Sequence, residues 1–134
     1  MHAIQTLIAA LQSPVASIRN HAAVALMDLH ESEAIGPLLE AIENPTHRNE
    51  RGTLIYALSG FDCKDKFHQL FRWALEGGYE ATGEALSIIC EQDVQADADT
   101  LSKCKALLAQ AHIHESVEPD LLLELRELLS QNNG

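Results

Sequence analysis

The chain of 134 residues carries 20 acidic and 9 basic residues, which gives a formal net charge of −11. Duplex nucleic acids and anionic membranes are bound through Lys and Arg, so this charge argues against both as partners. The length suits one compact domain, and a composition rich in Ala, Leu and Ile but poor in Val favours helices. Either the charge attracts a partner with basic groups, or it only confers solubility.

Apolar residues recur at spacings of three and four along the chain, and short breakers separate them into eight expected helices. These helices cover about residues 2–12, 14–29, 34–43, 49–59, 64–76, 80–92, 100–112 and 119–131, with 132–134 as a frayed tail. The first is expected to be a helix and not a signal peptide, because no Lys or Arg precedes its apolar patch. The second should turn Ile18, Ala22, Ala25, Leu26 and Leu29 inward.

A repeated register joins these helices into pairs. A shift of 32 residues places Arg19 on Arg51 and Ala25-Leu26 on Ala57-Leu58, and a further shift of 28 places Ala57-Leu58 on Ala85-Leu86. A helix pair repeated about every 30 residues is typical of a helical solenoid. The expected repeats cover about 2–30, 33–60, 63–92 and 97–131.

The segments SIRNHAAVALMDL and EAIGPLLEAIENP resemble HEAT repeats of the short type found in phycobilisome-lyase-like repeat proteins. The matching residues are Ile18, Arg19, Ala22, Ala23, Ala25, Leu26 and Leu29, then Ala34, Ile35, Pro37, Leu38, Ala41 and Ile42. The match is strong over about residues 3–58 and fair to 92, whereas only helical length and apolar spacing support the last pair. The resemblance implies one all-α domain over 1–131, a right-handed helical solenoid (α-α superhelix) of about four antiparallel helix pairs.

The same resemblance implies a structural role for Arg19 and Arg51. Such an arginine usually ties one pair of helices to the next through a carboxylate in the adjoining link. Ligand binding is the less favoured alternative, since Arg presents donors that suit either use.

Two His-Glu pairs, His30-Glu31 and His114-Glu115, are similar to those that bind the di-iron centre of deoxyhypusine hydroxylase, a HEAT-repeat enzyme. The positions that match that family's pairs are Asn20-His21, Gly52-Thr53 and Glu80-Ala81, and none is His-Glu. We therefore expect no di-iron site.

A zinc site at the C-terminal histidines is the remaining metal hypothesis. His112, His114 and Glu115 could supply three ligands if this segment were extended, or they could simply end a helix. The sequence has no HExxH, GxSxG or glycine-rich phosphate loop. We expect no catalytic residue, no bound metal and no cofactor.

The three cysteines are Cys63, Cys90 and Cys104, an odd number without CxxC spacing. This favours reduced, buried thiols in a cytoplasmic protein. Cys63 lies close to Lys64 and Lys66, a setting that could lower its pKa, but an inert thiol is the favoured interpretation.

The second helices of a HEAT stack line its concave face, where partners commonly dock. The register places nine residues on the outward side of these helices: Asn20, Val24 and Asp28; Gly52, Tyr56 and Gly60; Glu80, Glu84 and Ser87. A tyrosine flanked by carboxylates suits a protein or peptide with basic residues. Alternatively, Tyr56 packs on a neighbouring helix and the acidic groups are merely solvated.

The sequence thus predicts a non-catalytic binding scaffold or adaptor. Its expected contact residues are Asn20, Val24, Asp28, Tyr56, Glu80 and Glu84. The alternative function is a cofactor-handling subunit similar to bilin lyases, for which Tyr56 is the sole candidate residue. A weak homodimer through an unfinished solenoid end is also conceivable, because the first helix shows no distinct polar capping face.

Overall fold

The computed structural model describes residues 3–47, 49–76, 78–114 and 118–131, with the backbone alone at 112–114. All regular structure in these ranges is helical, which confirms the all-α expectation. The α-helices are α1 (Ala3–Ala10), α2 (Ala16–Leu29), α3 (Ile35–Glu43), α4 (Gly52–Leu58), α5 (Phe67–Glu76), α6 (Tyr79–Glu91), α7 (Ala98–His114) and α8 (Pro119–Gln131). Short 3-10 helices, Ser32–Ala34 and Pro45–His47, precede α3 and α4. None of the described helices has the length and apolarity needed to cross a membrane.

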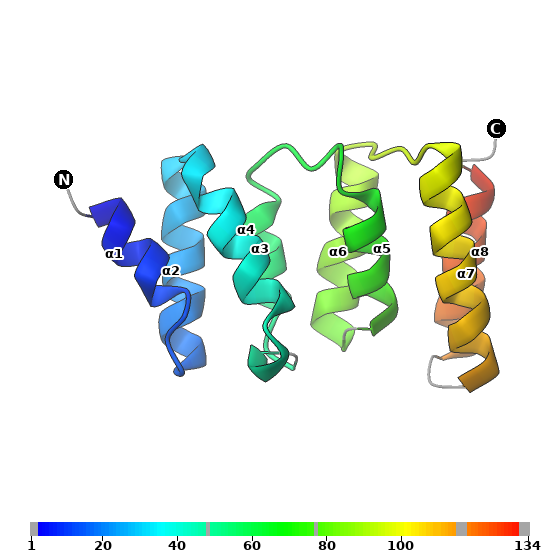
Figure 1. Cartoon of the computed structure of the whole chain (residues 1–134), viewed down its shortest axis with the longest axis horizontal. Helices are drawn as coiled ribbons and strands as arrows, with labels where there is room; N and C mark the ends of the chain where they lie inside the picture. The colour runs from blue at the N-terminus through cyan, green and yellow to red at the C-terminus, as the bar shows by residue number, and fades with distance from the viewer. Residues whose placement is uncertain (1–2, 48, 77, 115–117, 132–134) are drawn as a thin grey trace.

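The helices form a row of sequential pairs (Figure 1). In each pair the two helices pack on one another: α1 on α2, α3 on α4, α5 on α6 and α7 on α8. Helices α1, α3, α5 and α7 lie in one layer and α2, α4, α6 and α8 in the other. Within these layers α2 packs on α4, α4 on α6, and α5 on α7.

One connected apolar core runs along the row from Leu11 to Leu129. Small residues let the second-layer helices approach closely, because a missing side chain leaves room for the neighbouring helix. A Cβ on Gly52 would lie 2.8 Å from the Cβ of Glu80 on α6. Two residues after the end of α4, a Cβ on Gly60 would clash with Met27 of α2. The two glycines therefore set how closely α4 packs on both neighbours.

Two buried arginines tie neighbouring pairs, as the resemblance implied. Arg19 is 1% exposed; its Nη1 donates to the Ser13 carbonyl at 2.8 Å and its Nη2 lies 3.0 Å from Oε1 of Glu50. Arg51 approaches Oε1 of Glu76 at 3.9 Å. A buried guanidinium is costly unless it is paired, so these contacts fix the positions of the link that carries Glu50 and of the C-terminal end of α5, which carries Glu76.

Further polar contacts join the second and third pairs. Glu43 of α3 pairs with Arg72 and accepts a hydrogen bond from Nε1 of Trp73 at 2.8 Å. Burial opposes ionisation of Glu43, but the hydrogen bonds from Arg72 and Trp73 outweigh it and hold the pKa of this carboxyl below its usual value. At the end of α6, the Gln92 side chain accepts from the Cys63 amide at 2.8 Å and donates to the Phe61 carbonyl at 2.9 Å.

The orientation of α2 differs from the expected one. Ile18 and Leu29, expected to face inward, are 46% and 50% exposed. The buried stripe is instead Arg19, Ala22, Ala23 and Leu26. Burial of Arg19 against Ser13 and Glu50 requires this rotation of about one residue, which brings Ala23 inward and turns Ile18 outward.

Helix starts also differ from the expected bounds. Helix α4 begins at Gly52 and not at Asn49, because a turn precedes it in which the Glu50 amide donates to the His47 carbonyl at 2.8 Å. Helix α5 begins at Phe67 and not at Lys64: Asp62 Oδ1 accepts from the Lys64 amide at 3.0 Å in a turn ahead of the helix. Asp97 Oδ1 accepts from the Thr100 amide at 2.7 Å, so α7 starts earlier than expected, at Ala98.

Candidate functional site: an acidic hollow over α6

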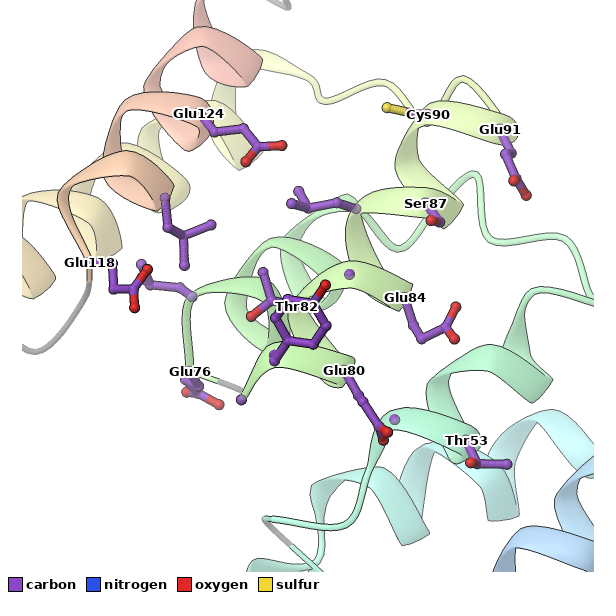
Figure 2. A pocket seen from close by; sticks show the side chains of 17 residues that line it. Thr53, Glu76, Glu80, Thr82, Glu84, Ser87, Cys90, Glu91, Glu118 and Glu124 are labelled. Atoms are coloured by element: carbon purple, nitrogen blue, oxygen red, sulfur yellow. The ribbon is translucent and has the colours of Figure 1, made fainter.

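A surface hollow of about 1050 Å³ lies over α6, between the first turn of α4 and helix α8 (Figure 2). Six of its lining residues are glutamates, and none is Lys, Arg or His. The glutamates are Glu76, Glu80, Glu84, Glu91, Glu118 and Glu124. The uncharged lining includes Leu75, Leu86 and Leu121. The hollow therefore combines apolar surface with a single sign of charge.

Helix α6 presents two adjacent stripes to this hollow, since residues three or four apart share one side of a helix. One stripe carries no charge and consists of Tyr79, Gly83, Leu86 and Cys90. The other consists of Glu80, Glu84, Ser87 and Glu91. Figure 2 shows Cys90 on the side of α6 toward α8, and Glu84 and Glu91 on the opposite side.

Helix α8 supplies the other wall. Glu118 lies just before the helix, and Leu121 and Glu124 follow it at steps of three, so the leucine sits between two carboxylates on one side of the helix. Figure 2 shows Glu124 pointing from α8 toward α6. The uncharged stripe of α6 is thus flanked by carboxylates on both sides.

Carboxylate crowding changes the electrostatics of the α6 stripe. Burial, with added repulsion from Glu80 and Glu91, raises the pKa of Glu84. Glu76 is compensated by Arg51 and Arg72. No ion pair to Glu80, Glu84, Glu91, Glu118 or Glu124 occurs within the residues that the structure describes. These five carboxylates leave the hollow with a negative potential.

Of the six contact residues predicted from the sequence, two lie at the hollow. Glu80 is exposed and Glu84 half-buried on its wall. The other four occupy the neighbouring second helices: Asn20, Val24 and Asp28 on α2, and Tyr56 on α4. Tyr56 is 43% exposed, Asp28 is exposed, and Asn20 and Val24 are half-buried. Gly52, expected to face outward with Tyr56, is buried against Glu80 instead.

The repeat register did not predict the α8 wall of the hollow, because the repeat match extends only to residue 92. The spacing of Glu118, Leu121 and Glu124 could have indicated it, since a leucine between two glutamates at steps of three marks one helix side. Tyr79 was missed as well. Its side chain is 96% exposed at the start of α6, which periodicity alone does not reveal.

The three thiols differ in exposure. Cys63 and Cys104 are fully buried, and burial raises the pKa of each to about 11, which makes both poor nucleophiles. Cys63 also approaches the Leu58 carbonyl at 3.3 Å. Cys90, expected to be buried, is exposed in the hollow. It belongs to the stripe of α6 that faces the hollow, whereas its apolar sequence neighbours Ile88 and Ile89 are buried and gave the wrong expectation.

The described part of the chain holds no candidate metal site. There, no three His, Cys, Asp or Glu side chains lie close enough together to hold an ion. His30 ends α2 in a left-handed conformation with φ 53°, its amide bonded to the Met27 carbonyl. The proposed ligands His112, His114 and Glu115 lie outside the residues whose side chains are described.

No protein-family model, curated protein or solved structure matches this chain. Its function is therefore inferred from the helix arrangement and from the hollow over α6.

Proposed function

We propose that the chain is a non-catalytic binding module, a right-handed HEAT-like solenoid of about four antiparallel helix pairs that captures a basic protein or peptide on its second-helix side. The observation that carries this proposal is the hollow over α6, with six glutamates and no cation in its lining. Asp28 and Tyr56 extend the same layer toward the N-terminal end and add a further carboxylate and an amphipathic ring. The free thiols accord with a reducing compartment, and we expect the protein to act in the cytoplasm.

Electrostatics would give such a module fast capture and selectivity against acidic partners. Lys and Arg side chains of the partner would relieve the repulsion that Glu80 and Glu91 exert on Glu84. Exposed ion pairs each contribute little, about 0.2–1 kcal/mol, so affinity must come from several contacts at once.

A fluorescent peptide in which Arg and Lys alternate with Gly and Ser tests this function. We expect salt-sensitive binding that falls about tenfold or more in the triple variant Asp28→Asn, Glu80→Gln, Glu84→Gln, because three attractive contacts are removed. The measurement is fluorescence anisotropy at two salt concentrations.

The matched control is Glu33→Gln, Glu40→Gln, Asp99→Asn, which removes three exposed acidic charges away from the hollow. Equal binding by both triple variants and the unchanged protein would refute the proposal. The cofactor-handling alternative gains no support from the hollow, because its glutamates would repel the propionate groups of a tetrapyrrole.

A further inference from the structure

The hollow over α6 has a shape and a distribution of charge that select one kind of basic segment. Its uncharged stripe, Tyr79, Gly83, Leu86 and Cys90, runs along α6 for most of the helix. Carboxylates border this stripe on both sides, from α6 itself and from α8. An amphipathic helix with an apolar stripe and basic residues on either side is the complementary surface.

We propose that the hollow binds an amphipathic basic α-helix of a partner protein, laid between α6 and α8. This inference rests on the proposed binding function and adds the site and the conformation of the ligand. The apolar side of the incoming helix contacts Leu86 and Leu121. Its Lys or Arg residues reach Glu124 on one side and Glu84 on the other.

The volume of the hollow is large enough for part of a helical ligand. One turn of α-helix, about 10 Å across and 5.4 Å long, fills roughly 400 Å³, so a hollow of about 1050 Å³ holds about two turns. The packing of the second layer gives a second reason: α2, α4 and α6 pack in sequence, whereas α6 and α8 are separated by the hollow. An inserted helix would restore helix-on-helix packing across this gap.

Tyr79 marks the end of the hollow at which the ligand helix would begin or end. It is 96% exposed, the most exposed of the large hydrophobic side chains described, and it belongs to the uncharged stripe. An aromatic ring beside several carboxylates suits an arginine, which can stack on the ring while it pairs with an acid. We therefore expect Tyr79 to contact a basic residue of the ligand.

Two synthetic peptides of about 15 residues test this inference: one places Leu at helical spacing among Lys and Arg, and the other has the same composition in scrambled order. We expect the amphipathic peptide to bind at least tenfold more tightly to the whole protein by calorimetry and to gain helicity by circular dichroism. Equal affinity for the two peptides would overturn the inference.

Matched variants on α8 locate the site. Leu121→Gln should weaken binding about tenfold, whereas Leu123→Gln, which changes an exposed leucine outside the hollow, should not. Glu124→Gln should weaken binding about two- to fivefold and Glu127→Gln should leave it unchanged; both carboxylates are exposed, so neither change threatens the fold. Equal effects within each pair would overturn the inference.

The extended basic peptide described above separates the two proposals. If the extended peptide binds through Glu80 and Glu84 but the amphipathic and scrambled peptides bind with equal affinity, the binding function stands. The proposal of a helical ligand is then wrong. If no basic peptide binds, both proposals fail.

Discussion

Glu84 is the residue at which the acidic character of the hollow can be measured directly. Its pKa is raised by burial and by the neighbouring charges of Glu80 and Glu91. A carboxyl whose pKa is higher in the folded state than in the unfolded chain favours folding while it is protonated. That contribution is present below the unfolded pKa and is lost as the pH rises through the folded pKa, so ionised Glu84 destabilises the fold at neutral pH.

We predict that Glu84→Gln raises the free energy of unfolding by about 0.5 kcal/mol at neutral pH, the size of a relieved like-charge pair at i, i+4. At about pH 3, where the wild-type carboxyl is protonated in both states, the two proteins should be equally stable. Urea unfolding at both pH values measures this. Glu40→Gln, on an exposed carboxyl of α3, is the control, and a gain at pH 7 that persists unchanged at pH 3 would contradict the prediction.

Single residues were the scale at which sequence reasoning did worst. Arg19 and Arg51 were expected to tie the helix pairs, and ion pairs with Glu50 and Glu76 confirm it. The exposures of Ile18 and Cys90 were wrong, because periodicity gives the spacing of a buried stripe but not its rotation about the helix axis. That rotation depends on tertiary contacts such as the burial of Arg19.

At the scale of elements, Gly52 of α4 and Gly83 of α6 have opposite surroundings. Gly52 opens α4 where a Cβ would lie 2.8 Å from the Cβ of Glu80, whereas Gly83 lies within α6 with nothing within 4 Å of its Cβ position. Gly52→Ala should lower the free energy of unfolding by about 1–3 kcal/mol through overpacking between α4 and α6. Gly83→Ala should raise it by about 0.5–1 kcal/mol, because alanine is the better helix former.

Chemical denaturation of both variants measures the two opposite changes in the free energy of unfolding. A loss of stability in Gly83→Ala would mean that α6 needs its glycine for a reason other than helix propensity. No loss in Gly52→Ala would mean that the α4–α6 contact relaxes freely.

Elements were predicted best where local signals end them. The bounds of α8 match the expectation from Pro119 onward, and α2 ends at Leu29 as expected. The starts of α4 and α5 were wrong by three residues, because hydrogen-bonded turns precede both helices and mimic a first helical turn. Part of the α6 wall of the hollow could be anticipated: the repeat register indicated Glu80 and Glu84, but it carried no information about α8.

At the scale of the whole molecule, the joints between helix pairs are unequal. Arg19 with Glu50 spans the first joint, and Glu43 with Arg72 and Trp73 spans the second. None of these polar ties spans the third joint, where α5 packs on α7, both helices contribute to the apolar core, and the hollow separates α6 from α8. In a row of packed helix pairs each pair is stabilised by its neighbours, so the last pair should open most easily as a unit.

We predict that amides of α7 and α8 exchange with deuterium faster than those of α4 and α6 in the native protein. Hydrogen exchange followed by mass spectrometry measures this for each helix. Equal protection of α7–α8 and α4–α6 would contradict the prediction. The amphipathic peptide bound between α6 and α8 should slow exchange in α8, since it would bridge the weakest joint.

Trp73 gives the chain a built-in optical reporter of only one of these joints. It is the single tryptophan, it is fully buried, and its indole bonds to Glu43 of the preceding pair. Because this bond joins Trp73 to the second pair, its emission should change little while the last pair opens, although far-ultraviolet circular dichroism would already record lost helix. The separation between the two melting curves is then a direct reading of how independently the C-terminal end of the row unfolds.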